Sequence, residues 1–566
     1  MRKHFNYLNL VMVYVFFTAL AWVSFPSLVS ASGWAKSYYL KDEVNLWPDS
    51  EVNSVLQTDD GGYILAGTVR APKSYIWVSK LDSEGKVLWI KGFDEGEINS
   101  MKACCLRKTA DGGYIVAGKF RIDKEDNWRD NMFVLKLDSE GKVAWQKAYG
   151  TPGPYFAYFE NEASILQTKD GGYILASNTD SESICGSRIC VLVLKLGAGG
   201  NITWQKAYGA YMGSALAIHC LQKAHKIVET PEGGYLLLAQ NISNTALVKL
   251  NAAGNITWQK VYEVSDKSGK LNVLDSIALA LVPTNEGKFL LAGRTVYRDN
   301  YDKPVPSVMW FMLVDGGGNP IWIKGYTDPV SGKGYTPVSI RQTKDGEYIV
   351  AGNRSDPYKK GYPPYDIFVI KLKADGTIRW KKIYAGYAGA LNLNYDDQAR
   401  SILETSDGGY ILGGLTYNFS PDWGDSSAAW ILKLDSEGNI PDCSVQSFTD
   451  HLQPTTDVKV TVENLEVSLK ETNISARDYP ASPFEPKVEE QEQCVANSKP
   501  SGDVSGDGEI NVVDALFVAR HVVGLSVSDF DASAADVNCD GEVNIVDALF
   551  IARKAVGLPV TGWCGD

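Results

Sequence analysis

Seven copies of one short repeat constrain the fold of this chain more than any other feature of its sequence. The clearest copy reads Asp-Gly-Gly-Tyr-Ile-Leu-Ala-Gly at Asp60–Gly67. The first glycine of the repeat recurs every 51 to 62 residues, at positions 61, 112, 171, 233, 287, 346 and 408. A period in this range is typical of a propeller, a solenoid or another repeat array.

Each repeat is predicted to form four short strands. An apolar run that ends in Thr, such as Val52–Thr58, precedes the Asp-Gly turn and the apolar Tyr-Ile-Leu-Ala segment. Asp-Gly supplies the positive φ that a tight hairpin needs. A third apolar segment, such as Phe133–Asp138, and a fourth with the pattern Trp-x-Lys complete the unit. Four antiparallel strands in each repeat are typical of a propeller blade.

The two ends of the repeat region complement each other. The seventh repeat lacks a fourth strand, because Pro441 follows soon after Gly438 and opposes a central strand. Trp34–Tyr39 resembles the fourth strand Trp145–Tyr149 but has no three strands before it. We therefore predict a mainly β fold over residues 32–440, a seven-bladed β-propeller whose N-terminal strand closes the last blade. The fourth-strand tryptophans of the other blades are Trp89, Trp145, Trp204, Trp258, Trp322 and Trp380.

These tryptophans are expected to pack one sheet on the next rather than to bind sugars, since each stands at the same place in its repeat. With its Gly-Gly-Tyr-x-x-x-Gly and Trp-x-Lys-x-Tyr signatures, the region resembles secreted bacterial and archaeal propellers. It is more loosely similar to quinoprotein-like and kelch-like propellers. The resemblance implies an architecture and no particular activity.

The N-terminus has the features of an export signal. A basic start precedes the apolar run Leu8–Phe25, and the small residues of Ser27–Ser32 predict cleavage after Ala31. We expect residues 1–31 to be a signal peptide and the protein to be secreted, either extracellular or associated with the cell surface. The alternative is an uncleaved anchor, because an apolar run of this length just spans a bilayer. Only in that case is the protein expected at a membrane.

Charge and cysteine content narrow the partners and the compartment. The net charge of −13 opposes general binding to nucleic acid or to anionic lipid. An exported chain permits disulfides, and with nine cysteines at least one thiol stays unpaired or pairs with another chain. The preferred pairs are Cys185–Cys190, which brackets a short loop, and Cys443–Cys494, which brackets an irregular stretch.

Residues 441–500 differ in composition from the repeats. They contain several prolines in irregular order and are predicted to be a semi-rigid linker. Val458–Val462 and Leu465–Leu469 alternate apolar and polar residues, so that short strands that pair with each other are expected within the linker. A small domain over residues 501–560 and a tail over 561–566 follow.

Two loops in this small domain carry oxygen-bearing side chains at the spacing of a calcium site. Residues 503–514 and 536–547 place them at positions 1, 3, 5, 9 and 12, with Gly at position 6. Calcium takes 6–8 oxygen ligands around such a turn, and position 7 offers its backbone carbonyl. We therefore predict two calcium ions. The expected ligands are Asp503, Ser505, Asp507, Glu509, Asn511 and Asp514 in the first loop and Asp536, Asn538, Asp540, Glu542, Asn544 and Asp547 in the second.

A helix is predicted after each loop, at Ala515–Leu525 and Ala548–Leu558. Paired EF-hand-like loops that end in Asp and lead into such helices resemble the dockerin type I domain. The resemblance implies a calcium-folded α-helical module whose partner is a cohesin-domain protein. The residues implied in partner binding are Val512, Val513, Arg520, Ile545, Val546 and Arg553. Four of them are apolar where many clostridial dockerins have Ser-Thr, which favours a more hydrophobic interface. The alternative is a calcium clamp within the chain.

Two classes of function remain for the propeller. It is expected to be a binding module for a polysaccharide or a surface ligand, carried to a cohesin-type partner. The alternative is a polysaccharide-degrading glycoside hydrolase, because dockerin-bearing proteins often act on polysaccharides. No Gly-x-Ser-x-Gly, His-Glu-x-x-His or phosphate-loop motif is present, so no catalytic residue is assigned. Acids expected near one mouth of the central funnel are Glu51, Glu160, Glu162, Asp275, Asp396 and Asp397, and solvated loop acids are the competing interpretation.

Overall fold

The computed structural model contains two compact units, one of residues 1–441 and 445–491 and the other of residues 442–444 and 492–566. We describe each unit by itself. The structure describes residues 33–41, 48–70, 74–94, 98–124, 127–150, 164–179, 189–209, 221–266, 272–298, 304–328, 332–355, 365–385, 396–417, 426–440, 453–455, 458–464, 469–471, 475–478, 482–484, 487–492, 502, 504–505, 510–525, 535, 537–538, 543–558 and 560.

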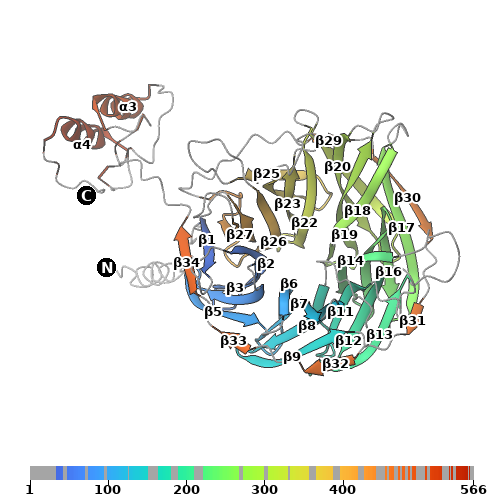
Figure 1. Cartoon of the computed structure of the whole chain (residues 1–566). Coiled ribbons are helices and arrows are strands. Elements are labelled where there is room, and N and C mark those ends of the chain that lie inside the picture. Colours follow the sequence, from blue (N-terminus) through green and yellow to red (C-terminus); the bar gives the residue numbers. More distant parts are fainter. Residues whose placement is uncertain are drawn as a thin grey trace, which may run out of the picture. The chain divides into compact units, whose positions relative to one another are not determined.

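The first unit is a ring of seven antiparallel four-stranded sheets (Figure 1). The innermost strands are β2 (Asp49–Gln57), β6 (Ile98–Lys108), β10 (Ser164–Gln167), β14 (Leu221–Glu229), β18 (Asn272–Pro283), β22 (Gly334–Gln342) and β26 (Asp397–Glu404). The second strands are β3 (Tyr63–Arg70), β7 (Tyr114–Lys124), β11 (Tyr173–Thr179), β15 (Tyr235–Asn241), β19 (Phe289–Arg298), β23 (Tyr348–Ser355) and β27 (Tyr410–Thr416).

The outer half of each sheet completes a blade of the propeller. The third strands are β4 (Tyr75–Leu81), β8 (Asn127–Leu137), β12 (Cys190–Leu196), β16 (Asn244–Leu250), β20 (Pro304–Val314), β24 (Tyr365–Leu372) and β28 (Ala428–Leu434). The fourth strands are β5 (Val87–Asp94), β9 (Val143–Gly150), β13 (Ile202–Tyr208), β17 (Ile256–Asp266), β21 (Pro320–Thr327), β25 (Ile378–Tyr384) and β1 (Trp34–Lys41). Each repeat of the sequence therefore forms one blade.

The N-terminal strand closes the ring, as predicted. β1 pairs antiparallel with β28, in a register that runs from Trp34 opposite Lys433 to Tyr38 opposite Ala429. Both aromatic side chains are buried and belong to one core cluster with residues of β2, β3 and β4. The seventh blade thus takes three strands from one end of the repeat region and one from the other, which leaves no four-stranded sheet incomplete.

The fourth-strand tryptophan of each blade packs on a turn of the next blade. A Cβ atom added to Gly85 would lie 2.7 Å from the ring of Trp34, so this turn fits only glycine. The φ of Gly85 is 83°, which also favours glycine. The hydroxyl of Tyr38 donates to the carbonyl of the same glycine at 2.5 Å. The expectation that the tryptophans serve packing is confirmed. The other pairs are Trp89–Gly141, Trp145–Gly200, Trp204–Gly254, Trp258–Gly318, Trp322–Gly376 and Trp380–Gly438.

The aspartate of the repeat holds the hairpin of its own blade. In six blades a lysine of the third strand pairs with the acid of the repeat, as Lys136 does with Asp111 at 2.8 Å. Lys136 and Thr109 lower the pKa of Asp111 to about 2. In the fifth blade Leu313 replaces the lysine, and Glu286 pairs with Lys288 instead. The repeated acid is therefore structural.

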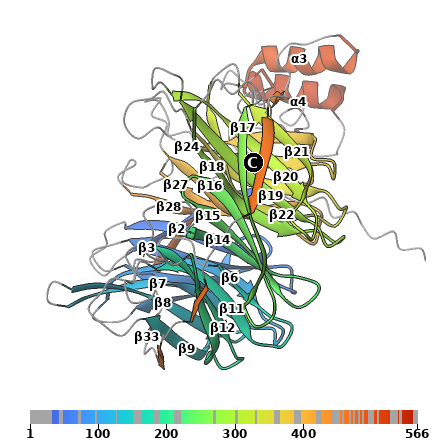
Figure 2. The same cartoon turned by 90° about the vertical axis from the view of Figure 1, so that its right-hand side faces the viewer.

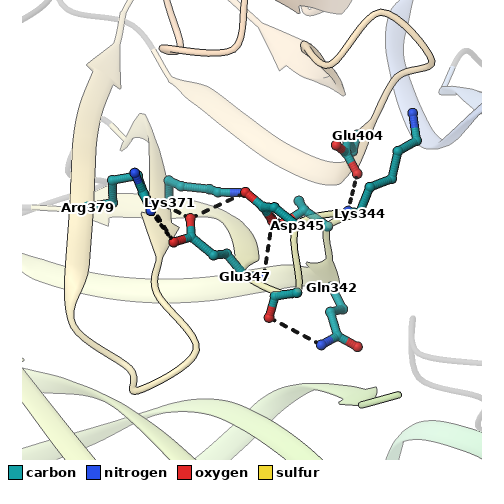
Figure 3. A network of polar contacts seen from close by, with 9 residues as sticks. Gln342, Lys344, Asp345, Glu347, Lys371, Arg379 and Glu404 are labelled. Atoms are coloured by element: carbon teal, nitrogen blue, oxygen red, sulfur yellow. Dashed lines mark hydrogen bonds and ion pairs between the residues drawn. The ribbon is translucent and has the colours of Figure 1, made fainter. Parts of the chain in front are cut away.

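The sixth blade shows how these hairpins also join neighbouring blades (Figure 3). Lys371 lies between Asp345 and Glu347, at 3.0 and 3.7 Å. The backbone N–H of Lys344 donates to Glu404 of the seventh blade at 2.7 Å. The same link recurs at four other seams, including the closing one between the seventh and first blades. These bonds are Ala110–Gln167, Lys169–Glu229, Asn285–Gln342 and Ser406–Gln57.

A buried acid reinforces the closing seam. The side chain of Glu51 on β2 is 3% exposed and pairs with Arg70 at 2.9 Å, with Arg400 of the seventh blade at 3.1 Å and with Lys102 of the second blade at 3.5 Å. Burial by itself raises the pKa of Glu51, but Arg400, Lys102 and Arg70 outweigh burial and lower it to about 2. Glu51 therefore stays ionised and ties three blades together.

Residues 453–492 differ from the predicted linker. They form short strands that add a fifth strand to six blades, in reverse order around the ring (Figure 1). Figure 2 shows the orange strand of this segment beside β17. Val458–Val462, expected to pair with Leu465–Leu469, lies in a strand that pairs with β17 instead. Of Leu465–Leu469 only Leu469 lies within the described residues. The added strands and their partners are β29 (Gln453–Thr455) on β21, β30 (Val458–Asn464) on β17, β31 (Leu469–Glu471) on β13, β32 (Ser475–Asp478) on β9, β33 (Ser482–Phe484) on β5 and β34 (Lys487–Glu492) on β1.

The second unit contains two packed helices, α3 (Val512–Val522) and α4 (Ile545–Ala555). Their small core includes Val518 and Ile551, which are fully buried. The helices begin three residues before the predicted starts, because Asn511 and Asn544 act as N-caps. No helix in the described part of the chain is long and apolar enough to cross a membrane. The predicted signal peptide lies outside the described residues.

The Glu51 cluster predicts acid sensitivity of the closed ring. Because the pKa of Glu51 is depressed from 4.5 to about 2, its ionised carboxylate stabilises the fold fully above about pH 4.5. This stabilisation is lost as the pH falls toward 2. The shift corresponds to about 3 kcal/mol. The Glu51→Gln variant should therefore lose less stability between pH 6 and pH 3 than the unchanged protein, as measured by thermal unfolding. Equal losses in both proteins would contradict this role.

Candidate functional site

The two predicted calcium loops end on equivalent buried carboxylates. Asp514 is fully buried and accepts the backbone N–H groups of Ser505 at 2.8 Å and Asn511 at 2.9 Å. Asp547 is fully buried as well and accepts those of Val537 at 3.0 Å and Asn544 at 2.9 Å. Each acid also completes a capping box at the start of its helix. The same local structure is thus built twice.

These residues fit calcium in their chemistry. An ionised carboxylate is costly to bury without a compensating charge, and no ion pair joins Asp514 or Asp547 to another residue that the structure describes. Hard oxygen donors are the ligands calcium prefers. Of the twelve expected ligands, Ser505, Asn511, Asp514, Asn538, Asn544 and Asp547 are described, whereas Asp503, Asp507, Glu509, Asp536, Asp540 and Glu542 lie outside the described residues. Among described residues alone, no group of three His, Cys, Asp or Glu gathers for a metal.

Both helices present apolar side chains to solvent at equivalent positions. Val512 and Ile545 are 60% and 59% exposed, and Val513 and Val546 are exposed beside them. The predicted arginines Arg520 and Arg553 are exposed too. Exposed apolar patches of this kind mark interaction surfaces. Further exposed apolar residues extend this surface beyond the predicted ones, and helical spacing from Val512 indicates several of them: Leu516, Val523, Leu525, Leu549, Val556 and Leu558.

The propeller has a channel at its centre. This cavity of about 640 Å³ is lined by the innermost strands of all seven blades. In six of these strands a β-bulge falls at the equivalent place, next to the apolar residue that packs into the blade. A bulge turns an extra side chain out of the regular pattern. The bulged residues therefore reach the channel: Asn53, Cys104, His225, Leu279, Val338 and Arg400.

Basic side chains dominate this lining. Of the residues that the structure describes, seven cationic residues and one acid, Asp275, face the channel. The cations are Lys102, Arg107, Lys223, Lys226, Arg294, Arg341 and Arg400. They were not predicted, because the acidic net charge of the chain conceals a local basic site. One signal was present: Arg107 and Arg341 stand where other repeats have Leu56 and Leu166.

The candidate acids of the funnel differ from one another in their burial and in their partners. Glu51 is ion-paired and ionised, so it is a poor proton donor. It is not a solvated loop acid either, because its side chain is buried. Asp275 lines the channel 3.9 Å from Arg294, and burial raises its pKa. Burial raises the pKa of Asp396 too, while its carboxylate accepts the N–H of Tyr365. Asp397 is fully buried on β26. Glu160 and Glu162 lie outside the described residues.

Two adjacent cysteines also line the channel. Cys104 and Cys105 are thiols with their sulfur atoms 3.0 Å apart. The hydrogen bond from Cys104, followed by the charges of Arg107 and Lys226, lowers the pKa of Cys105 to about 7 against the opposing effect of burial. Cys190 is disulfide-bonded, and Cys185, its expected partner, lies outside the described residues. The expected Cys443–Cys494 pair also lies outside them.

Comparisons with known proteins give one family match, within the smaller unit, and several similar solved structures. Residues 501–554 match the family model of the dockerin type I domain. Similar solved structures include a catalytically inactive virginiamycin B lyase from Staphylococcus aureus, with 11% identity, a TM-score of 0.36 and coverage of 71% of this chain and 99% of that chain. They also include an alpha-L-arabinanase from Penicillium chrysogenum, with 10% identity, a TM-score of 0.28 and coverage of 49% and 93%. The comparison with curated proteins returns no match. Residues 501–554 are a dockerin type I domain, carried by a chain whose other unit is a seven-bladed β-propeller.

Proposed function

We propose that the protein is an extracellular docking component. Its residues 501–560 fold around two calcium ions and bind a cohesin domain, and its propeller is carried there as a ligand-binding module. The proposal rests on one arrangement that occurs twice: a buried carboxylate in the first turn of a helix that also carries exposed apolar side chains. Dockerin type I domains bind calcium and dock on cohesin domains, and the match over residues 501–554 supports the same activity here.

Calcium would supply the charge that the two buried carboxylates lack. Asp514 and Asp547 stand at the last ligand position of their loops, and backbone N–H groups orient each of them. Asn511 and Asn544 fix the helix starts next to them. Ion binding in the loop is therefore coupled to the position of the following helix. Through the helix it is coupled to the exposed apolar residues and arginines of α3 and α4, which we call the docking face.

The docking face is expected to work in two equivalent ways. Val512 and Val513 on α3 have exposed counterparts in Ile545 and Val546 on α4, and Arg520 corresponds to Arg553. A partner that recognises one helix start would therefore recognise the other as well. The apolar side chains favour a partner surface that is itself hydrophobic.

Hydrolysis of polysaccharide is the second candidate function, and Asp275 is the observation that favours it. Its raised pKa suits a general acid. A glycosidase needs a second carboxyl about 5–10 Å away, whereas Asp275 is the sole acid among the described residues of the channel lining. Release of reducing ends from a polysaccharide panel, lost in Asp275→Asn, would establish this activity. Glycan binding without such release would refute it.

Calcium binding tests the first part of the proposal. The full chain is expected to bind two ions in calorimetric titration, and Asp514→Ala to bind one, because it removes a buried ligand from one loop only. Asp547→Ala should lose the other ion. Glu84→Ala, which removes an exposed acid of a propeller turn, is the matched control and should retain both. Two ions retained by Asp514→Ala would contradict the assignment.

Docking tests the second part. Binding of the full chain to a panel of recombinant cohesin domains should require calcium and should disappear in EDTA. Val512→Asp removes one of two equivalent modes and should lower affinity by about half, whereas Val512→Asp combined with Ile545→Asp should abolish binding. Leu88→Asp, which changes an equally exposed residue of the propeller, should have no effect. Unchanged binding by the double variant would refute this docking face.

A further inference from the structure

Within the described residues, the lining of the channel carries more basic than acidic side chains. Glu51 pairs with Lys102 and Arg400, and Asp275 with Arg294. No carboxylate in the described residues forms an ion pair with Arg107, Lys226 or Arg341. Arg107 and Arg341 each donate instead to the carbonyl of the residue before them, at 2.7 and 2.8 Å. Each guanidinium thus keeps most of its five donors for another partner.

These three cations repel one another within the fold. They come from β6, β14 and β22, three different blades, and meet at the channel. Burial, then the charges of Arg107 and Arg341, lower the pKa of Lys226 well below its ordinary value. Burial and Arg107 lower the pKa of Arg341 to about 10. The thiolate of Cys105 offsets at most one of the three charges. The fold thus holds an electrostatic cost that an anion in the channel would relieve.

The remaining lining suits the hydroxyl groups of a sugar. Four serines, Ser54, Ser164, Ser339 and Ser401, face the channel from separate blades. The buried Nε of Arg294 has no hydrogen-bond partner among the described residues. The described lining contains no Trp, Tyr or Phe, so a neutral sugar or a nucleobase finds no stacking platform there. A volume of about 640 Å³ accommodates a ligand of oligosaccharide size.

We propose that the central channel of the propeller binds an acidic oligosaccharide, a short sugar chain that carries carboxylate or sulfate groups. Arg107, Arg341 and Lys226 bind the acidic groups, and the serines accept and donate hydrogen bonds with the hydroxyl groups. A planar guanidinium group can donate two parallel hydrogen bonds to two oxygen atoms of one carboxylate or sulfate group. The inference rests on the proposed role of the propeller as a binding module, but it needs neither calcium nor a cohesin partner.

Calorimetric titration of the full chain in EDTA tests the proposal, with oligogalacturonate and a sulfated oligosaccharide as acidic probes. A neutral oligosaccharide of the same length and inorganic sulfate are the controls. We expect at least one acidic probe to bind, more weakly as salt rises, and neither control to match it. Equal binding of inorganic sulfate, which means a small-anion site only, would overturn the proposal, and so would absence of binding by both acidic probes.

Variants locate the site. Arg341→Met and Arg107→Met should each weaken binding by at least about tenfold, since each removes a charge-assisted contact. Both variants should melt no lower than the unchanged protein, because they relieve repulsion. Lys91→Met, which removes a half-buried cation of the outer strand β5, away from the channel lining, should bind normally. Unchanged binding in the two arginine variants would place the ligand elsewhere and overturn the proposal.

The two cysteines give an independent readout of position. Cys104 and Cys105 line the same cavity, and a pKa of about 7 leaves Cys105 reactive at pH 8. Saturating acidic oligosaccharide should slow their alkylation by iodoacetamide, measured by peptide mass spectrometry. Because EDTA is present throughout, a failed calcium or docking experiment leaves this result unaffected. Alkylation at the same rate with bound ligand would contradict a site in the channel.

Discussion

Strand pairing between β1 and β28 is the constraint on which the rest of the structure depends. A ring of sheets is stable only if its last sheet packs on its first, and here the last sheet contains both ends of the repeat region. Trp34 and Tyr38 make on the first blade the contacts that Trp145 and Tyr149 make on the third. The closing seam is therefore built from the same parts as the other seams, with the ion pairs of Glu51 in addition.

The residues that recur from blade to blade are not the residues that form the channel. The repeated Gly, Trp and Asp-Lys positions lie in turns and between sheets, where they determine how blades fold and stack. Most side chains that reach the channel come from the innermost strands, often at bulges, and they differ from blade to blade. A regular scaffold can thus hold an irregular site, with Arg107, Lys226 and Arg341 supplied by three separate blades.

The sequence predicted the architecture because hairpin and packing residues are local and repeated. Counting fourth strands was enough to join Trp34–Tyr39 to the seventh repeat. The spacing of oxygen-bearing side chains was enough to predict the dockerin domain matched at residues 501–554. The channel was not predictable in the same way. A bulge changes which side chain faces inward, so strand periodicity does not identify Cys104 or Arg400 as lining residues. A strand at Val458–Val462 was expected, but the pairing of the strands within residues 453–492 with the blades was not, because it depends on open edges formed elsewhere in the chain.

Backbone hydrogen exchange of the full chain tests the closed ring most directly. If β1 pairs with β28, the amides of residues 34–40 should be protected to the same degree as those of residues 428–434 and should exchange only when the ring opens. A chain that lacks residues 1–41 should lose protection at residues 428–434, and the peptide 33–41 should restore it. Rapid exchange of residues 34–40 in the intact protein, beside a protected β28, would contradict closure by the N-terminal strand.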